Sequence, residues 1–198
     1  MYYYFNSDFS SEKKIVYFTG TMYYQNKKFD ENLFNDGIYI DEKKFSEPFK
    51  LIVDESDSAY KNRRLTDRIL LYVVSAGKMR LISPKLVEVL KSMSIKNVQF
   101  FDIEIEASDF KLENYKLLNI TDKIDCMDLD KSDVELDDDG DIYDLRSLVL
   151  DESKIPDNQQ LFLLGRDSGA VILIHENLKN KLQQESITGV FYETLEEG

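Results

Sequence analysis

The chain has 198 residues, of which 42% are hydrophobic, and it contains 12 Tyr, 12 Phe, three Pro and one Cys. This balance is typical of a globular domain, and it excludes a largely disordered chain, a collagen and a disulfide-stapled scaffold. The 38 acidic residues outnumber the 25 basic ones and give a net charge of −13. That charge argues against a broad nucleic-acid-binding face and against binding to anionic membranes, because both need an excess of Lys and Arg.

The beginning of the chain and its apolar runs predict a location. Residues Met1–Asp8 have neither the basic nor the apolar region of a signal peptide. The longest uninterrupted apolar stretch, Ile69–Val74, is six residues long, whereas a membrane helix needs about 20. The single Cys126 stands among acidic residues, which should raise the pKa of its thiol and keep it unreactive. We therefore expect a cytoplasmic protein without disulfides.

Residues 1–55 form an aromatic-rich β segment that holds 14 of the 24 Tyr and Phe residues. Short runs typical of strands occur at Ile15–Thr21, Gly37–Ile40 and Phe49–Val53, and Asn35–Gly37 is a turn signal between two of them. We expect most of these rings to fill the core and the pleat of a sheet, because strands favour aromatic residues. The alternative is that some Tyr side chains stay exposed as recognition anchors.

Two later segments resemble each other. When the sequence is shifted by 92 residues, residues 69–100 align with residues 161–192 without a gap, and nine positions are identical. These are Leu71/Leu163, Gly77/Gly169, Leu81/Leu173, Ile82/Ile174, Leu86/Leu178, Leu90/Leu182, Ser94/Ser186, Ile95/Ile187 and Val98/Val190. Each segment predicts a strand, a Gly-containing turn, a second strand, a helix and a third strand. Duplication of an ancestral unit and shared architecture without common descent both explain this pattern.

The helix in the first segment has a clear beginning. Ser83 is a good N-cap and Pro84 suits the first helical position, and apolar residues follow at helical spacing from Leu86 to Met93. In the second segment only Leu178 and Leu182 continue this stripe, so we expect that helix to be more exposed. We predict one α+β domain over residues 1–198, with a mainly antiparallel or mixed β-sheet and short helices.

The stretch from Asp125 to Asp144 is strongly acidic. Its 20 residues include ten acids, and Lys131 is their only base. The acids are Asp125, Asp128, Asp130, Asp133, Glu135, Asp137, Asp138, Asp139, Asp141 and Asp144. Because like charges repel, we expect a long polar loop here and neither a helix nor a central strand. Such a loop would serve solubility, or it would dock as a negative arm on a basic protein surface.

Known catalytic and metal-binding patterns do not fit. Glu135, Asp137, Asp139 and Gly140 match the first positions of a calcium loop, but Arg146 occupies the position of its last ligand. The sequence has no phosphate-binding glycine loop, no GxSxG and no CxxC. The only histidine, His175, takes the place of Ser83 in the second segment, so we expect it at a helix N-terminus. We expect no metal, no cofactor and no catalytic residue.

Several stretches resemble a bacterial protein family. These are Tyr115–Ile120, Asp125–Ser132, Leu81–Leu86 and Ile187–Val190. The family was once catalogued only as a domain of unknown function and is now grouped with the immunity proteins of polymorphic toxin systems, as family eleven of that catalogue. The resemblance covers roughly Leu81 to Glu193, and the aromatic N-terminal segment matches less clearly.

The resemblance implies a protein that binds and neutralises a cognate toxin. Many toxins of such systems are nucleases with a basic cleft, which an acidic surface can occupy. The expected partner-binding residues lie in the acidic loop: Asp133, Glu135, Asp137, Asp138, Asp139, Asp141 and Tyr143. An enzyme that reverses a toxin's modification and an acidic structural or regulatory protein without a toxin partner remain the alternatives. The sequence does not reveal the oligomeric state.

Overall fold

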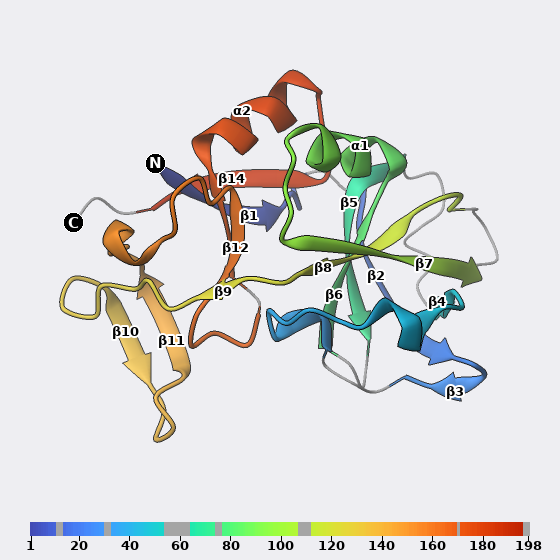
Figure 1. Ribbon diagram of the computed structural model, residues 1–198, viewed down its shortest axis with the longest axis horizontal. Coiled ribbons are helices and arrows are strands. Elements are labelled where there is room, and N and C mark those ends of the chain that lie inside the picture. Colours follow the sequence, from blue (N-terminus) through green and yellow to red (C-terminus); the bar gives the residue numbers. More distant parts are fainter. Residues whose placement is uncertain are drawn as a thin grey trace.

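The computed structural model describes residues 1–10, 14–29, 33–53, 64–73, 77–106, 112–169 and 171–195. Within these residues the protein is mostly β structure, arranged as a ring of six strands and a separate five-stranded sheet (Figure 1). Two α-helices, α1 (Pro84–Ser92) and α2 (Glu176–Gln184), contact each other along the top of Figure 1. The prediction of a mixed β architecture with short helices is confirmed.

The first β structure is a closed barrel. Its strands follow each other in the order β2 (Lys14–Tyr24), β4 (Phe49–Val53), β7 (Val98–Glu106), β8 (Lys116–Ile120), β6 (Gly77–Ile82) and β5 (Arg64–Val73), and β5 pairs again with β2. The β2–β5 and β4–β7 pairs are parallel and the others are antiparallel. The short β3 (Lys27–Lys28) pairs with the end of β2. Closure leaves the ring without a free edge.

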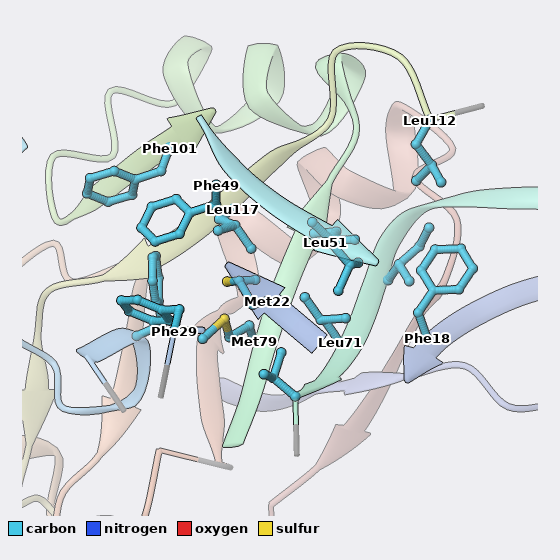
Figure 2. Packing of buried hydrophobic residues seen from close by; sticks show 14 of the residues in the cluster. Phe18, Met22, Phe29, Phe49, Leu51, Leu71, Met79, Phe101, Leu112 and Leu117 are labelled. Carbon is cyan, nitrogen blue, oxygen red and sulfur yellow. The ribbon is translucent and has the colours of Figure 1, made fainter. Parts of the chain in front are cut away.

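Aromatic and aliphatic side chains fill the barrel. Alternate residues of a strand point inward, as on β4, where Phe49, Leu51 and Val53 are buried and the residues between them are exposed. Figure 2 shows the ring of Phe49 beside that of Phe101, and their centroids lie 6.2 Å apart in an edge-to-face arrangement. Phe18, Phe29, Phe34 and Phe49 all belong to this cluster. The expectation that the N-terminal aromatic residues mainly build the core is therefore confirmed for these side chains.

The second β structure is a sheet with both faces covered. Its order is β14 (Val190–Thr194), β1 (Tyr2–Ser7), β13 (Ile172–His175), β12 (Leu161–Leu164) and β9 (Lys123–Ile124). Tyr3 and Phe5 of β1 pack on one face with the two helices and with the outer side of the barrel. Tyr2 lies on the opposite face, in a cluster with Cys126 and Phe162.

The acidic region and three short 3₁₀ helices complete the described structure. The acidic region contains the two-stranded sheet β10 (Asp133–Leu136) and β11 (Ile142–Ser147). The 3₁₀ helices are η1 (Leu33–Asn35), η2 (Glu42–Phe45) and η4 (Glu152–Lys154).

Two expectations about the N-terminal segment need correction. Gly37–Ile40 is not a strand but an irregular link between η1 and η2, which begins in a turn at Gly37. The Gln99 side chain takes the place of a strand partner for the backbone of Ile40. It accepts a hydrogen bond from the Ile40 N–H and donates one to the Ile40 carbonyl, each at 2.8 Å. Strand β1 was missed, and it lies in the five-stranded sheet, whereas β2 and β4 lie in the barrel.

The two similar segments contain corresponding elements in the same order. Residues 69–100 contribute to β5, β6, α1 and β7, and residues 161–192 to β12, β13, α2 and β14. The two helices occupy aligned positions. Ser94 and Ser186, each two residues after the end of its helix, have similar positive φ angles of 55° and 52°. The strand register differs by one residue, since Ile69 pairs with Leu81 but Leu161 pairs with Ile174. The turn residues 74–76 lie outside the described residues, and duplication stays a prediction.

The predicted helix features are confirmed. The Ser83 hydroxyl accepts a hydrogen bond from the Leu86 N–H at 3.2 Å, with Pro84 in the first turn. Helix α1 buries four side chains and α2 buries only Leu178 and Leu182. The second helix is the more exposed one, as the narrower apolar stripe indicates.

Candidate functional site

The acidic stretch forms a β-hairpin, not the predicted loop. Strands β10 and β11 pair antiparallel from Asp133↔Ser147 to Leu136↔Ile142 and extend away from both larger β structures (Figure 1). The expectation considered only the charges within the stretch and left out Arg146, which follows it. Arg146 lies just beyond the acidic stretch, and on the hairpin it reaches carboxylates of both strands.

Arg146 compensates the charge at the base of the hairpin. Its Nη1 lies 2.8 Å from Asp133 Oδ1 and its Nε lies 3.1 Å from Asp144 Oδ2, while its Nη2 contacts Glu135. The hydrogen bonds that Arg146 donates to Glu135 and Asp133 raise the pKa of Arg146 above its usual value. The ladder skips Arg146, since Ser147 and Leu145 pair with consecutive residues of β10. Such a bulge redirects the side chain, here toward the three acids.

Asp137 shapes the turn at the end of the hairpin. Its Oδ1 accepts hydrogen bonds from the backbone N–H groups of Asp139 and Asp141, at 3.0 and 2.9 Å. Gly140 adopts a φ of +84°, which favours glycine, and its N–H donates to the Asp137 carbonyl at 3.0 Å. Asp137 is thus a turn-forming residue, as expected for an Asp that bonds its own backbone.

The end of the hairpin carries the uncompensated charge. Asp138, Asp139 and Asp141 are exposed, and in the part of the chain that the structure describes none of them forms an ion pair. We call these three residues the acidic tip. Five other acids of the stretch have a cationic partner: Arg146 contacts three of them, Asp125 pairs with Arg166 at 2.9 Å and Asp128 lies 3.7 Å from Lys131.

Tyr143 is placed beside the acidic tip by a second bulge. The ladder passes from Glu135↔Asp144 directly to Leu136↔Ile142, so Tyr143 has no partner on β10. Its side chain is 78% exposed, the highest value among the large hydrophobic residues described. A large ring held on an ordered strand loses little conformational freedom on binding, and Tyr is common among binding hot spots.

Apolar contacts fix the other side of the hairpin to the molecule. Val134, Ile142 and Leu145 pack against the buried cluster around Cys126 and Phe162. The Ile142 N–H also donates to the Arg166 carbonyl at 2.7 Å. The hairpin is therefore a projection with one face packed against the core, which fixes the position of the acidic tip and Tyr143.

The structure confirms the predicted place of His175. It is the N-cap of α2, and its Nδ1 accepts a hydrogen bond from the Asn177 N–H at 3.2 Å. Burial and the charge of the N-terminal amine lower the pKa of His175. The residue is thus neutral near pH 7 and acts in helix capping.

Cys126 is buried, as its unreactive role requires. The pKa of its thiol is raised to about 11, mainly by burial and only secondarily by Asp125 and Asp151. The predicted direction was right, but the main cause is the low-polarity surroundings and not the neighbouring acids.

One pocket lies at a structural joint between the two helices. Its volume is about 440 Å³, and it lies between the end of α1 and the beginning of α2. Gln159 on its wall already donates to Asp122 Oδ2 and to the Leu161 carbonyl, each at 2.9 Å. The Asn97 side chain donates to the same carbonyl at 2.6 Å. These amides connect the five-stranded sheet to neighbouring loops.

Sequence reasoning missed a second pocket, which contains two buried arginines. Arg68 and Arg80 lie on the outer side of β5 and β6, next to exposed aromatic rings. No local motif marks them, because their neighbours in the pocket come from both ends of the chain. Only the rarity of Arg within the apolar strand segments could have drawn attention to them.

Other kinds of site find no support in the described part of the chain. No three or more His, Cys, Asp or Glu side chains there are arranged to hold a metal ion. None of its helices has the length and apolar character needed to cross a membrane.

Comparison with protein families decides the relationship. The sequence matches the immunity protein family Imm11 over residues 3–197. The chain belongs to the Imm11 immunity protein family. The match includes the aromatic N-terminal segment, so the relationship extends well beyond the part that the sequence motifs covered. A search of curated proteins finds no match to this immunity protein.

Proposed function

We propose that this immunity protein binds a cognate bacterial toxin and blocks its active site with the acidic hairpin. The observation that carries the proposal is the position of Asp138, Asp139 and Asp141, which are exposed at the end of an ordered projection without compensating cations in the described residues. Family membership supports the general role, because the family is one of immunity proteins.

The charge distribution favours a partner with a basic surface. Residues 133–147 carry seven carboxylates and one arginine, and Arg146 neutralises the base of the hairpin and not its end. An exposed cluster of one sign attracts the opposite sign and accelerates association. A basic cleft that normally binds nucleic acid offers such a surface, since its side chains are arranged to contact phosphates. A nuclease toxin is therefore the partner class that we propose.

Complementary charges increase the specificity and the association rate of a complex more than its affinity. A tight complex therefore also needs a side chain that becomes buried in the interface. Tyr143 stands beside the acidic tip and is almost fully exposed. We propose that its ring is buried in the complex, with Asp133 and Glu135 at the rim, where their charges are already shared with Arg146. In this mechanism the protein acts as a cytoplasmic stoichiometric inhibitor within a polymorphic toxin system and catalyses no reaction.

The test is a mixture of the purified protein with the toxin domain encoded by the neighbouring gene. We expect a stable one-to-one complex by size-exclusion chromatography with light scattering, and full inhibition of the toxin at about one equivalent. Protection at a small fraction of one equivalent would instead indicate an enzyme that reverses the toxin's modification. Absence of any complex or protection would indicate an acidic structural or regulatory protein.

A further inference from the structure

Two arginines are buried on the outer side of the barrel. Arg68 of β5 is 4% exposed and Arg80 of β6 is 1% exposed. Their strands are paired, with Leu70 opposite Arg80 and Arg68 opposite Ile82. Alternate residues Ile69, Leu71 and Met79 fill the barrel, so both arginines point away from its interior.

Neither arginine has a full set of partners. Arg68 Nη1 donates to Ser7 Oγ at 2.8 Å, and its guanidinium lies 4.7 Å from the centre of the Phe5 ring. Arg80 Nη1 donates to the Phe34 carbonyl at 3.2 Å and to Asn35 Oδ1 at 3.1 Å, and its Nη2 donates to the Gly169 carbonyl. The Nε atoms of both residues are buried and have no hydrogen-bond partner among the residues that the structure describes.

All these partners are neutral groups. Within the described residues no carboxylate forms an ion pair with either guanidinium, and Asp167 is the acid whose charge acts on Arg80 from farther away. Burial and, secondarily, the charge of Arg80 lower the pKa of Arg68 to about 9, and burial lowers that of Arg80 to about 10. Both side chains remain cationic at pH 7, in a protein whose net charge is −13. Buried cations are normally paired with an anion.

A pocket of about 380 Å³ opens beside the two arginines. Lys78 adds a third cation to its wall, and three aromatic residues are exposed at its edge. Phe9 is 57%, Phe191 52% and Tyr72 37% exposed. The rings of Phe9 and Tyr72 both contact Tyr17, with centroids 6.0 and 6.2 Å from it, and so form a row across the surface. We call this site the arginine pocket.

We propose that the arginine pocket receives an Asp or Glu side chain of the toxin, with Phe9, Tyr72 and Phe191 packed against apolar residues around that acid. This inference rests on the proposed function and adds a second contact to it. The two buried guanidinium groups form the binding site for the carboxylate of that acid. The exposed rings extend the contact surface beyond the pocket. Small-molecule sites enclose most of their ligand, whereas these rings face solvent, as in a protein interface where Arg and aromatic residues dominate the binding energy.

The arginine pocket and the acidic hairpin are connected by one loop. The Arg166 carbonyl accepts from the Ile142 N–H of the hairpin, and the Gly169 carbonyl accepts from Arg80. A partner that contacts both surfaces must present cations to one and an anion to the other. Such opposed charges fix the orientation of a complex and disfavour partners with a uniformly basic surface.

The experiment measures binding of the neighbouring gene's toxin domain to wild type and to variants of the exposed edge. Tyr72→Ala and Phe191→Ser should each weaken the dissociation constant at least tenfold, and Lys78→Glu should weaken it as well. Tyr39→Ala is the matched control, because Tyr39 is 70% exposed and does not line the pocket. It should bind as wild type does.

The buried arginines are tested separately with Arg68→Met and Arg80→Met. Each toxin acid near the interface is also replaced by its amide, and the acid that enters the pocket should lose its contribution in the arginine variants. If an arginine variant fails to fold, the edge variants still decide the question, since their side chains are exposed.

The outcomes are distinct. If wild type binds the toxin and the edge and arginine variants bind equally well, the arginine pocket is no toxin contact, while the proposed function stands. If wild type forms no complex with the toxin, both the proposed function and the role of the arginine pocket are wrong. If inorganic phosphate or AMP raises the Tm of wild type but not of Arg68→Met, and competes with the toxin, the pocket binds a free anion and the proposed occupant is wrong.

Discussion

The acidic tip can be tested by removing its charge without changing its shape. The triple variant Asp138→Asn, Asp139→Asn, Asp141→Asn keeps side chains of similar size and leaves Asp137 to form the turn. Substitution of Asp137 itself would confuse the loss of charge with a change in the hairpin. The tip residues are exposed and unpaired within the described structure, so their removal should leave the Tm nearly unchanged.

The size of the effect follows from the exposure of these charges. An exposed ion pair changes an equilibrium constant by about twofold in typical cases, so three of them together should weaken toxin binding about eightfold at physiological salt. The loss should lie mainly in the association rate, because unpaired surface charges steer the encounter. At 0.5 M salt the screening length falls to about 4 Å, and wild type and variant should then differ by less than about twofold.

Surface plasmon resonance with immobilised toxin domain, over a series of salt concentrations, measures both rates. The control is Glu47→Gln, Glu88→Gln, Glu113→Gln, which removes the same charge from exposed positions elsewhere. An equal loss in this control would mean that only the overall charge matters. An unchanged rate in the tip variant would refute the contact between the hairpin and the toxin.

Four further predictions concern the scaffold. Replacement of Arg146 by Met should accelerate amide hydrogen exchange in residues 133–147 and hardly change the global Tm, because it removes the cation shared by three carboxylates. Since the folded-state pKa of His175 lies below its ordinary value, the free energy of unfolding should fall as the pH decreases below about 6.5, and His175→Asn should reduce this slope in urea titrations. Phe49→Ala should cost about 3–5 kcal/mol of stability in urea, because Phe49 is completely buried in the barrel. The Cys126 thiol should resist Ellman's reagent at pH 8 until the protein is unfolded, and fast reaction of the native protein would contradict its burial and its pKa of about 11.

Local signals in the sequence predicted local structure well. The N-cap at Ser83, the position of His175 before α2 and the strand Phe49–Val53 depend on neighbouring residues, and all three are confirmed. The hairpin was missed because Arg146, which offsets the charge of its strands, stands outside the acidic stretch and contacts residues 11 and 13 positions earlier.

The closure of the barrel and the arginine pocket could not be predicted, because both depend on contacts between residues far apart in the sequence. The barrel closes through the β2–β5 and β4–β7 contacts, which no turn signal encodes. The arginine pocket combines Ser7, Arg68, Arg80 and Phe191, so its members are brought together only by the complete fold. At Gly37–Ile40 the local pattern predicted a strand that does not form, because the side-chain amide of Gln99 bonds the backbone of Ile40 in place of a neighbouring strand.

The position of β1 between β14 and β13 has a consequence for biosynthesis. Tyr3 pairs with Ile174 and with Thr194, so β1 finds its neighbours only after the strands between them in the sequence have been synthesised. Until then the aromatic residues Tyr2–Phe5 remain without their native cover, and a nascent chain in that condition is a natural client for chaperones. Protection by this protein should accordingly lag behind its translation by the time that this last pairing takes.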